Sequence, residues 1–518
     1  MHFQERFRTF FIVIQGLLTM KKLRSTMSLT DFVSALEEWK TIWRRKGGRR
    51  NVAHRRHARN LIRKHTQLYK KATGHVDLPR LDRSFGDEHA WLETPPERTM
   101  LLIAPPGSND DSDDGFSDSQ MRRRVRRLVK ENLSAGSSTV LDLVNAGNAK
   151  NKRLPSVAVA ANRKSGMRGL FLEALGAAIL PELSLADVEA LEASGAVVLE
   201  NTLISLTDPV EEISSDSKNG WHLPVINVAA AREKKLNGSG AIIGILDTGI
   251  DASHPEFKGK KIDFRAFEPN GSPSRFVSQP LDFHSHGTHV SAICAGATVG
   301  VAPDAEIAVA AVLTKRDAQG RMCGYTNQIV AGINWLARQA GSRGSGVDII
   351  NASLGGSNIE RKYYSVYNVY RSRGLLTIAA IGNDGHMGIG YHGSPGKFNC
   401  VIGVGASDVN HHVAPFSAWG PSYGNTTISA FKPDLVAPGV NIHSALPNAL
   451  YGPMSGTSQA CPQVSGAAAL LIQQDPSLRR NADRLANRLL ALTCVLPSSP
   501  HNADVRRFGY GRLDLASI

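Results

Sequence analysis

Short apolar segments alternate with helix-like stretches through the C-terminal part of the chain, from Trp221 onward. Each apolar segment has the length and composition of a buried β-strand. Such alternation is typical of a parallel sheet whose two faces are both covered by helices. We therefore predict an α/β domain on a doubly wound, mostly parallel sheet, with strands at 241–246, 307–313, 347–350, 375–380 and 401–404.

The chain is long enough for this domain and for further units N-terminal to it. Of its 518 residues, 42% are hydrophobic and 20% are charged, which excludes a wholly disordered, collagenous or polytopic membrane protein. Changes in composition predict four parts: a basic, mainly helical extension (1–94), an acidic and basic linker with a short amphipathic helix at 119–133 (95–154), a small α+β unit (155–212) and the α/β domain (213–518). The first part of the linker, 95–119, is Pro/Gly-rich and then acidic, so we expect it to be disordered.

The net charge of +14 suggests a nucleic-acid or membrane-surface partner. Much of it comes from residues 40–71, which contain 13 basic residues and no acidic one. This segment could present a solvated basic face, bind an acidic regulatory protein, or bind nucleic acid. Binding of nucleic acid is not supported by a motif, because no stacking-aromatic or groove-reading pattern accompanies the charge.

Cysteine usage and the N-terminal leader bear on the compartment. The five cysteines are odd in number and show no CxxC or Cys/His metal spacing, so we expect free thiols and a reducing compartment. An apolar stretch at 10–18 is too short to span a bilayer as a helix and lacks a small-residue cleavage site. We expect no transmembrane segment and favour a cytoplasmic location, while secretion stays open.

Three stretches of the α/β domain place reactive side chains beside glycines. Asp247 ends an apolar strand in 243–249, and a carboxylate at the C-terminal end of a parallel strand lies where α/β sheets build their sites. His286 precedes an apolar helix, and Ser458 opens another helix, whose N-terminal N–H groups favour an oxyanion. Serine needs a base, and an imidazole serves as one when a third group orients it. Asp247, His286 and Ser458 can supply these roles.

The three stretches resemble the D-T-G, H-G-T-H-V and G-T-S-x-A-x-P signatures of the subtilisin-like serine proteases, in that family's order. The resemblance covers the chain from Trp221 to its end and implies a subtilisin-like fold and a serine endopeptidase. It implies a catalytic triad of Asp247, His286 and Ser458. It also implies that Asn383, in the segment 379–383, is the side-chain donor of the oxyanion hole.

The resemblance further implies that polypeptide substrates bind as an added strand beside residues 353–356, the substrate strand, and that 322–325 could form the other edge of the cleft. The substrate-binding residues would be Ser353, Leu354, Gly355, Gly356, Ala380 and Gly393. Gln459, Gln463 and Ile381 depart from the usual family residues, which puts the size of the substrate pocket in question. The chain also lacks the calcium loop of many secreted relatives after Gly296, so we expect no tight calcium site of that kind, no other metal and no cofactor.

The unit at 155–212 is similar to the family's inhibitory propeptide, which packs on the enzyme, assists folding and is removed by self-cleavage. Its sequence predicts a helix at 170–175, a helix that begins after Ser184 and ends at Gly195, and a strand at 196–206. This unit would act as an intramolecular inhibitor of a zymogen. Self-cleavage would then fall between about Asp208 and Trp221.

Other functions compete with this reading. The D-T-G motif is also half of an aspartic-protease site, but that chemistry needs two such carboxylates, and a second D-T-G or D-S-G is absent from the sequence. His284, His286 and His289 could bind zinc, although the sequence supplies no acidic or cysteine fourth ligand near them. A third alternative is a catalytically silent protein that interacts through its basic N-terminal arm.

Overall fold

The computed structural model describes residues 99–103, 118–132, 142–145, 168–181, 183, 185–206, 220–317, 320–355, 363–424 and 430–518. The chain divides into two compact units, Met1–His89 and Ala90–Ile518, and all described residues belong to the second. The basic extension predicted at 1–94 lies outside the described residues.

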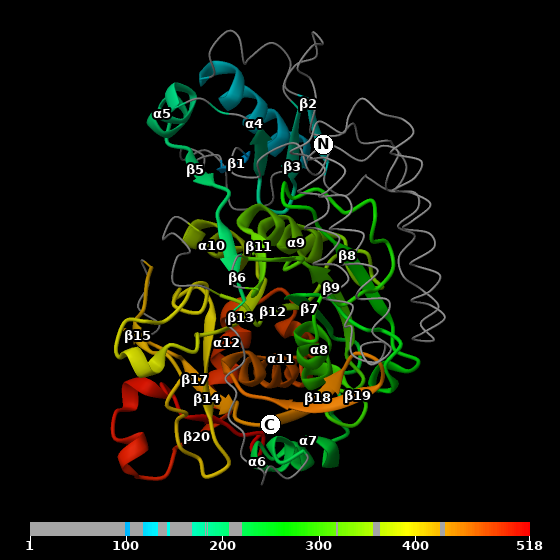
Figure 1. The fold of residues 1–518 in the computed structure, drawn as a ribbon, viewed down its shortest axis with the longest axis vertical. Helices are drawn as coiled ribbons and strands as arrows, with labels where there is room; N and C mark the ends of the chain where they lie inside the picture. Colours follow the sequence, from blue (N-terminus) through cyan, green and yellow to red (C-terminus); the bar gives the residue numbers. More distant parts are fainter. Residues whose placement is uncertain are drawn as a thin grey trace, which may run out of the picture. The chain divides into compact units, whose positions relative to one another are not determined.

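Within the described residues, nine strands form the main sheet in the order β20-β21-β17-β14-β13-β12-β7-β9-β8 (Figure 1). Neighbours are parallel except β20 and β21. The strands are β7 (Ile242–Asp247), β8 (Ile262–Ala266), β9 (Glu306–Ala311), β12 (Ile349–Ala352), β13 (Leu376–Ala380), β14 (Ile402–Ser407), β17 (Leu435–Pro438), β20 (Thr493–Cys494) and β21 (Arg512–Leu513). The strands predicted from the apolar segments are thus confirmed.

Helices cover both faces of this sheet, as predicted. One core joins alternate residues of β7, such as Ile243 and Ile245, to α8 (His286–Ala295), α11 (Thr457–Gln474) and α12 (Ala482–Ala491). The opposite core joins Ile242 and Leu246 of the same strand to α9 (Thr326–Arg338) and α10 (Tyr364–Ser372). Successive side chains of a strand point to opposite faces, so a strand buried on both sides is apolar throughout.

The remaining elements of this domain are short: α6 (His222–Val225), α7 (Val228–Glu233), β10 (Lys315–Arg316), β11 (Met322–Tyr325), β15 (Gly420–Pro421), β16 (Phe431–Lys432), β18 (Ile442–Leu446), β19 (Leu450–Met454) and the 3₁₀ turns Pro255–Phe257, Gly385–Met387, Pro476–Leu478, Pro500–Asn502 and Val505–Arg507. Among the described helices, none is both long and apolar enough to cross a membrane. The cysteines lie in described residues and are free thiols.

The described part of the N-terminal α+β unit is larger than predicted. Its sheet has the order β2-β3-β4-β1-β5, with β1 (Thr99–Ile103), β2 (Asp142–Asn145), β3 (Arg168–Leu172), β4 (Ala177–Pro181) and β5 (Val197–Glu200). β1 pairs with both β4 and β5, so a segment expected to be disordered linker is an inner strand. The predicted boundary at 155 therefore leaves out two strands of this sheet. Apolar β1 is too short to show a period, and its partners follow it by more than 70 residues.

Helices of the same unit pack beside this sheet. α4 (Asp118–Asn132) confirms the predicted amphipathic helix, and its Val125 and Val129 are buried in one cluster with Leu191 of α5 (Leu185–Ala193). The predicted helix at 170–175 is wrong, since these residues form the end of β3 and the turn into β4. A six-residue segment whose residues are apolar except for Glu173 does not distinguish a helix from a buried strand.

Candidate active site

Asp247 and His286 meet at the C-terminal edge of the main sheet. Asp247 is the last residue of β7 and His286 is the first of α8, and both side chains are fully buried. His286 Nδ1 lies 2.8 Å from Asp247 Oδ1 and 3.0 Å from Oδ2. A carboxylate in this position accepts the Nδ1–H, which leaves Nε2 of a neutral imidazole as the basic nitrogen.

Glycines allow the strand end and the helix start to approach this closely. A Cβ on Gly287 would lie 2.1 Å from the Gly249 carbonyl oxygen. A Cβ on Gly249, whose φ is +127°, would lie 2.0 Å from the Leu281 carbonyl oxygen. Both contacts are far inside van der Waals distance, so only glycine fits at these positions.

Two polar residues that the sequence analysis did not single out support this junction. The Thr248 hydroxyl accepts a hydrogen bond from Gly287 N at 2.9 Å and donates one to Asp282 at 2.7 Å. Asp282 also accepts from the backbone N and the hydroxyl of Thr288. Burial raises the pKa of Asp282, while these hydrogen bonds oppose the shift. In the sequence, the only sign that Thr248 and Asp282 support the site was their position in or near the D-T-G and H-G-T-H motifs.

The two neighbouring histidines, His284 and His289, both have a pKa below the ordinary value for histidine. His289 Nε2 lies 3.2 Å from the Gly452 carbonyl oxygen, and complete burial lowers the pKa of His289 to about 3. Burial, followed by the nearby His286, lowers the pKa of His284 to about 4. Over the described ranges, no group of three or more His, Cys, Asp and Glu side chains is placed to hold a metal ion.

Ser458 is the second residue of the 18-residue helix α11, and 5% of its surface is exposed. Its hydroxyl donates to the Ser353 carbonyl oxygen at 3.1 Å, and the Ser353 hydroxyl donates to the Ser458 carbonyl oxygen at 2.9 Å. The structure thus brings the predicted nucleophile to the predicted substrate strand. The start of a long helix offers unpaired backbone N–H groups to an anion.

The side chain of Asn383 lies beside the start of the same helix. Its Oδ1 accepts hydrogen bonds from both N and Oγ1 of Thr457, each at 2.9 Å, and Gly382 N donates to Thr457 Oγ1 at 3.1 Å. These donors identify which end of the amide is oxygen and turn the Asn383 NH₂ group away from Thr457. Thr457 was present in the G-T-S motif, but the motif did not reveal this contact.

The predicted substrate strand directly follows β12. A Cβ on Gly355 would lie 2.8 Å from the Ser394 carbonyl oxygen, so this glycine permits close approach of two backbone segments. Ala380 ends β13, and Gly393 N donates to the carbonyl oxygen of Ile381, the next residue, at 2.8 Å. Leu354 is buried. Gly356 lies outside the described residues.

The opposite edge of the expected cleft pairs with the chain's own N-terminal unit. β6 (Leu203–Ser205) is antiparallel to β11, with Ile204 opposite Gly324, and Leu206 N donates to the Met322 carbonyl oxygen at 2.5 Å. Ile204 and Leu206 are buried, whereas Leu203 is 42% exposed. The segment therefore binds as an added strand with alternate side chains facing inward.

The strand predicted at 196–206 is in fact two strands, β5 and β6, separated at Asn201. The Asn201 side chain accepts from Asn327 N at the start of α9 at 2.9 Å and donates to the Pro269 carbonyl oxygen at 3.0 Å. These bonds draw the chain out of the first sheet before it pairs with β11. A periodic apolar pattern carries no information on such a distant partner.

Further polar contacts join the α+β unit to α9 and to the residue before α10. The Asn334 side chain accepts from Ala174 N at 2.8 Å and donates to Glu173 at 3.1 Å. The Tyr363 hydroxyl donates to the Glu200 carbonyl oxygen at 2.8 Å. These bonds, together with the apolar cluster shared by both parts, hold the unit on the helices that cover this face of the sheet.

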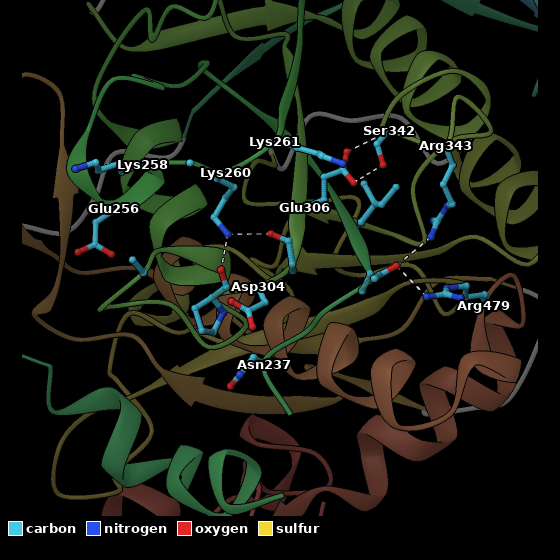
Figure 2. Close-up of a pocket in the computed structure, with 17 residues that line it drawn as sticks. Asn237, Glu256, Lys258, Lys260, Lys261, Asp304, Glu306, Ser342, Arg343 and Arg479 are labelled. Atoms are coloured by element: carbon cyan, nitrogen blue, oxygen red, sulfur yellow. Dashed lines mark hydrogen bonds between the residues drawn. The ribbon is translucent and has the colours of Figure 1, made fainter. Parts of the chain in front are cut away.

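The pocket in Figure 2, about 930 Å³ in volume, lies at the N-terminal ends of β7 and β9 and contains none of the predicted catalytic residues. Several of its charged side chains bind neighbouring protein groups. Glu306 accepts from the N and hydroxyl of Ser342, at 2.7 and 2.6 Å, and Arg343 contacts Asp348 at 2.7 Å. The pocket lies at the N-terminal end of β7, whereas Asp247 lies at the C-terminal end of the same strand.

Comparison with known proteins agrees with the fold and the motifs. Residues 238–511 match the Subtilase family. The chain is 34% identical over 301 residues to an alkaline protease of Alkalihalobacillus alcalophilus, covering 57% of this chain and 69% of that protein. It is 36% identical over 262 residues to Subtilisin BL of Lederbergia lenta (50% and 85%) and 36% identical over 258 residues to the major intracellular serine protease of Bacillus subtilis strain 168 (48% and 73%).

The chain therefore belongs to the subtilase family of serine proteases. The predicted family, the α/β subtilisin fold and the class of enzyme, a serine peptidase that acts on polypeptides, are confirmed.

Proposed function

We propose that Ser458, His286 and Asp247 form the catalytic triad of this peptidase. The observation that carries the proposal is the buried contact of Asp247 with His286 Nδ1, at an edge of the sheet where Ser458 opens helix α11. His286 Nε2 takes the hydroxyl proton as Ser458 attacks the peptide carbonyl. Asp247 holds the ring and stabilises the imidazolium, which then protonates the leaving amine.

The Ser458 hydroxyl donates to the Ser353 carbonyl oxygen in this structure. A substrate that adds as a strand along 353–355 competes for this backbone acceptor. Binding of the peptide would then release the hydroxyl toward His286. This couples occupation of the cleft to activation of the nucleophile.

The oxyanion hole would consist of the Asn383 NH₂ group and the backbone N–H of Ser458. Both Thr457 hydrogen bonds hold the oxygen end of the Asn383 amide, which supports the NH₂ end as the donor. Preorganised donors stabilise the charge that develops on the carbonyl oxygen in the tetrahedral intermediate.

We propose that the α+β unit is a propeptide-like inhibitor that the enzyme removes from itself. Pairing of β6 with β11 supports this role, because it places the chain's own segment on an edge expected to bind substrate. Self-cleavage between about Asp208 and Trp221 stays a prediction, and 207–219 lie outside the described residues. A cytoplasmic location and a regulatory partner for the basic segment also stay predictions.

Labelling with a fluorophosphonate probe tests the nucleophile and self-processing together. We expect the wild-type protein to gain one probe mass and Ser458→Ala to gain none. Intact-mass measurement of both proteins also reports whether the N-terminal unit has been removed. Ser465→Ala, about two helix turns further along α11 and away from the proposed triad, is the matched control and should label normally. Equal labelling of wild type and Ser458→Ala would disprove the assignment.

A further inference from the structure

Asn351 lies between the nucleophile helix and the substrate strand. It belongs to β12, two residues before Ser353, and is fully buried. Its Oδ1 accepts hydrogen bonds from Ser465 Oγ at 2.9 Å and from Cys461 Sγ at 3.3 Å. Its Nδ2 donates to Ser353 Oγ at 3.0 Å. One amide therefore joins two turns of α11 to the strand that would bind the peptide.

The donors define the orientation of this amide. The shorter of the two contacts to Asn351 Oδ1 is the 2.9 Å bond from Ser465 Oγ. Burial raises the pKa of the Cys461 thiol, so this group is a donor at neutral pH, and its Sγ lies 3.3 Å from both Asn351 Oδ1 and the Ile378 carbonyl oxygen. The amide oxygen of Asn351 consequently faces the helix, and its NH₂ group faces Ser353.

The bond from Asn351 to the Ser353 hydroxyl determines the direction of the bond between Ser353 and Ser458. A serine hydroxyl has a single proton. Because Ser353 Oγ accepts from Asn351, that proton is available for the bond to the Ser458 carbonyl oxygen, at 2.9 Å. The chain of donation runs from Asn351 through Ser353 to the backbone of the nucleophile.

We propose that Asn351 is a positioning residue, which acts through the Ser353 hydroxyl to set the distance between Ser458 and the bound peptide. The inference rests on the proposed role of Ser458 as the nucleophile. Substrate would still pair with the backbone of 353–355 after loss of the amide. The placement of Ser458 relative to the bound carbonyl would change, and small displacements of this kind lower the rate of the chemical step.

The test is a double-mutant cycle with Asn351→Ala and Ser353→Ala, which keeps the backbone that pairs with substrate. We expect Asn351→Ala to lower kcat for a peptide substrate about tenfold and to leave KM within about twofold. In the Ser353→Ala background, Asn351→Ala should have little further effect, because the group through which it acts is already absent. Ser465→Ala is the control: it removes one donor to the Asn351 oxygen, keeps the bond to Ser353, and should retain wild-type kcat.

A kcat unchanged by Asn351→Ala, or losses that multiply in the double variant, would overturn the proposal. An equal loss of kcat in Ser465→Ala would also overturn it, since general loosening of the helix would then explain the result. If Asn351→Ala does not fold, Asn351→Asp replaces it in the cycle. Its carboxylate keeps the acceptor for Cys461 and Ser465 but removes the donor to Ser353, so kcat should fall as the pH rises and this carboxyl ionises. A pH profile identical to that of the wild type would count against the proposal. Failure of the proposed triad itself would appear separately, as equal probe labelling in wild type and Ser458→Ala.

Discussion

Replacement of Asn383 by alanine tests the proposed oxyanion hole most directly. The variant loses one of two proposed donors, while the Ser458 backbone N–H stays in place. We expect kcat to fall by about a hundred- to a thousandfold, the size known for such a donor in subtilisin and equal to about 2.7–4 kcal/mol. KM should change little, because the donor acts on charge that develops in the transition state.

The structure also predicts a limited cost in stability. Asn383 is 5% exposed, and its oxygen accepts two hydrogen bonds from Thr457, each worth about 1 kcal/mol net. The free energy of unfolding should therefore fall by about 1–3 kcal/mol. This loss is measurable by urea denaturation and is distinct from the loss of turnover.

The assay compares kcat and KM for one peptide substrate in wild type, Asn383→Ala and Thr457→Val. Thr457→Val removes the hydroxyl bonds of Thr457 to the Asn383 oxygen and from Gly382 N, and retains the Thr457 backbone bond and the NH₂ donor. Its kcat should fall about tenfold or less. An unchanged kcat in Asn383→Ala would refute the oxyanion-hole assignment, and an equal loss in both variants would show that orientation alone explains the effect.

Three further predictions concern the triad, the inhibitory segment and stability in acid. Asp247→Asn should lower kcat by about 10⁴-fold near neutral pH with little change in KM, because an amide cannot hold the same histidine tautomer. Steady-state kinetics would measure this loss, and a wild-type kcat in this variant would contradict the triad. Leu206→Asp places a charge at a buried position of the segment that pairs with β11, so it should increase the initial rate of probe labelling of the full chain several-fold. Leu203→Asp, a change at the 42% exposed Leu203 of the same segment, should leave the rate unchanged. Equal rates in the wild type and both variants would argue against inhibition by this segment. Since the pKa of buried His289 is lowered to about 3 from an ordinary 6.5, the unfolded state binds the proton first and stability falls as the pH drops below about 6.5. At pH 5 this one group should lower the free energy of unfolding by about 2 kcal/mol relative to pH 8. Urea denaturation of His289→Gln should therefore show a smaller loss of unfolding free energy between pH 8 and pH 5 than the wild type, and an equal loss in both proteins would contradict this expectation.

The main sheet and the reactive residues could be predicted because their signals are local. Apolar segments such as 241–246 and 401–404 have strand length and composition, and the motifs around Asp247, His286 and Ser458 are contiguous. The α+β unit was harder to predict. β1 is an inner strand only because β4 and β5 lie on either side of it, and the interruption at Asn201 depends on Asn327 and Pro269.

The sequence by itself determined the class of the chain, since side chains of the required chemistry stand beside glycines in the order of the subtilase motifs. It also determined the α/β architecture, because buried parallel strands need continuous apolar segments. Only the tertiary structure decided the contacts of Thr457 with Asn383, of Asn351 with α11, and of β6 with β11. These contacts depend on three-dimensional proximity between segments separated by tens to more than a hundred residues, for which local periodicity carries no signal.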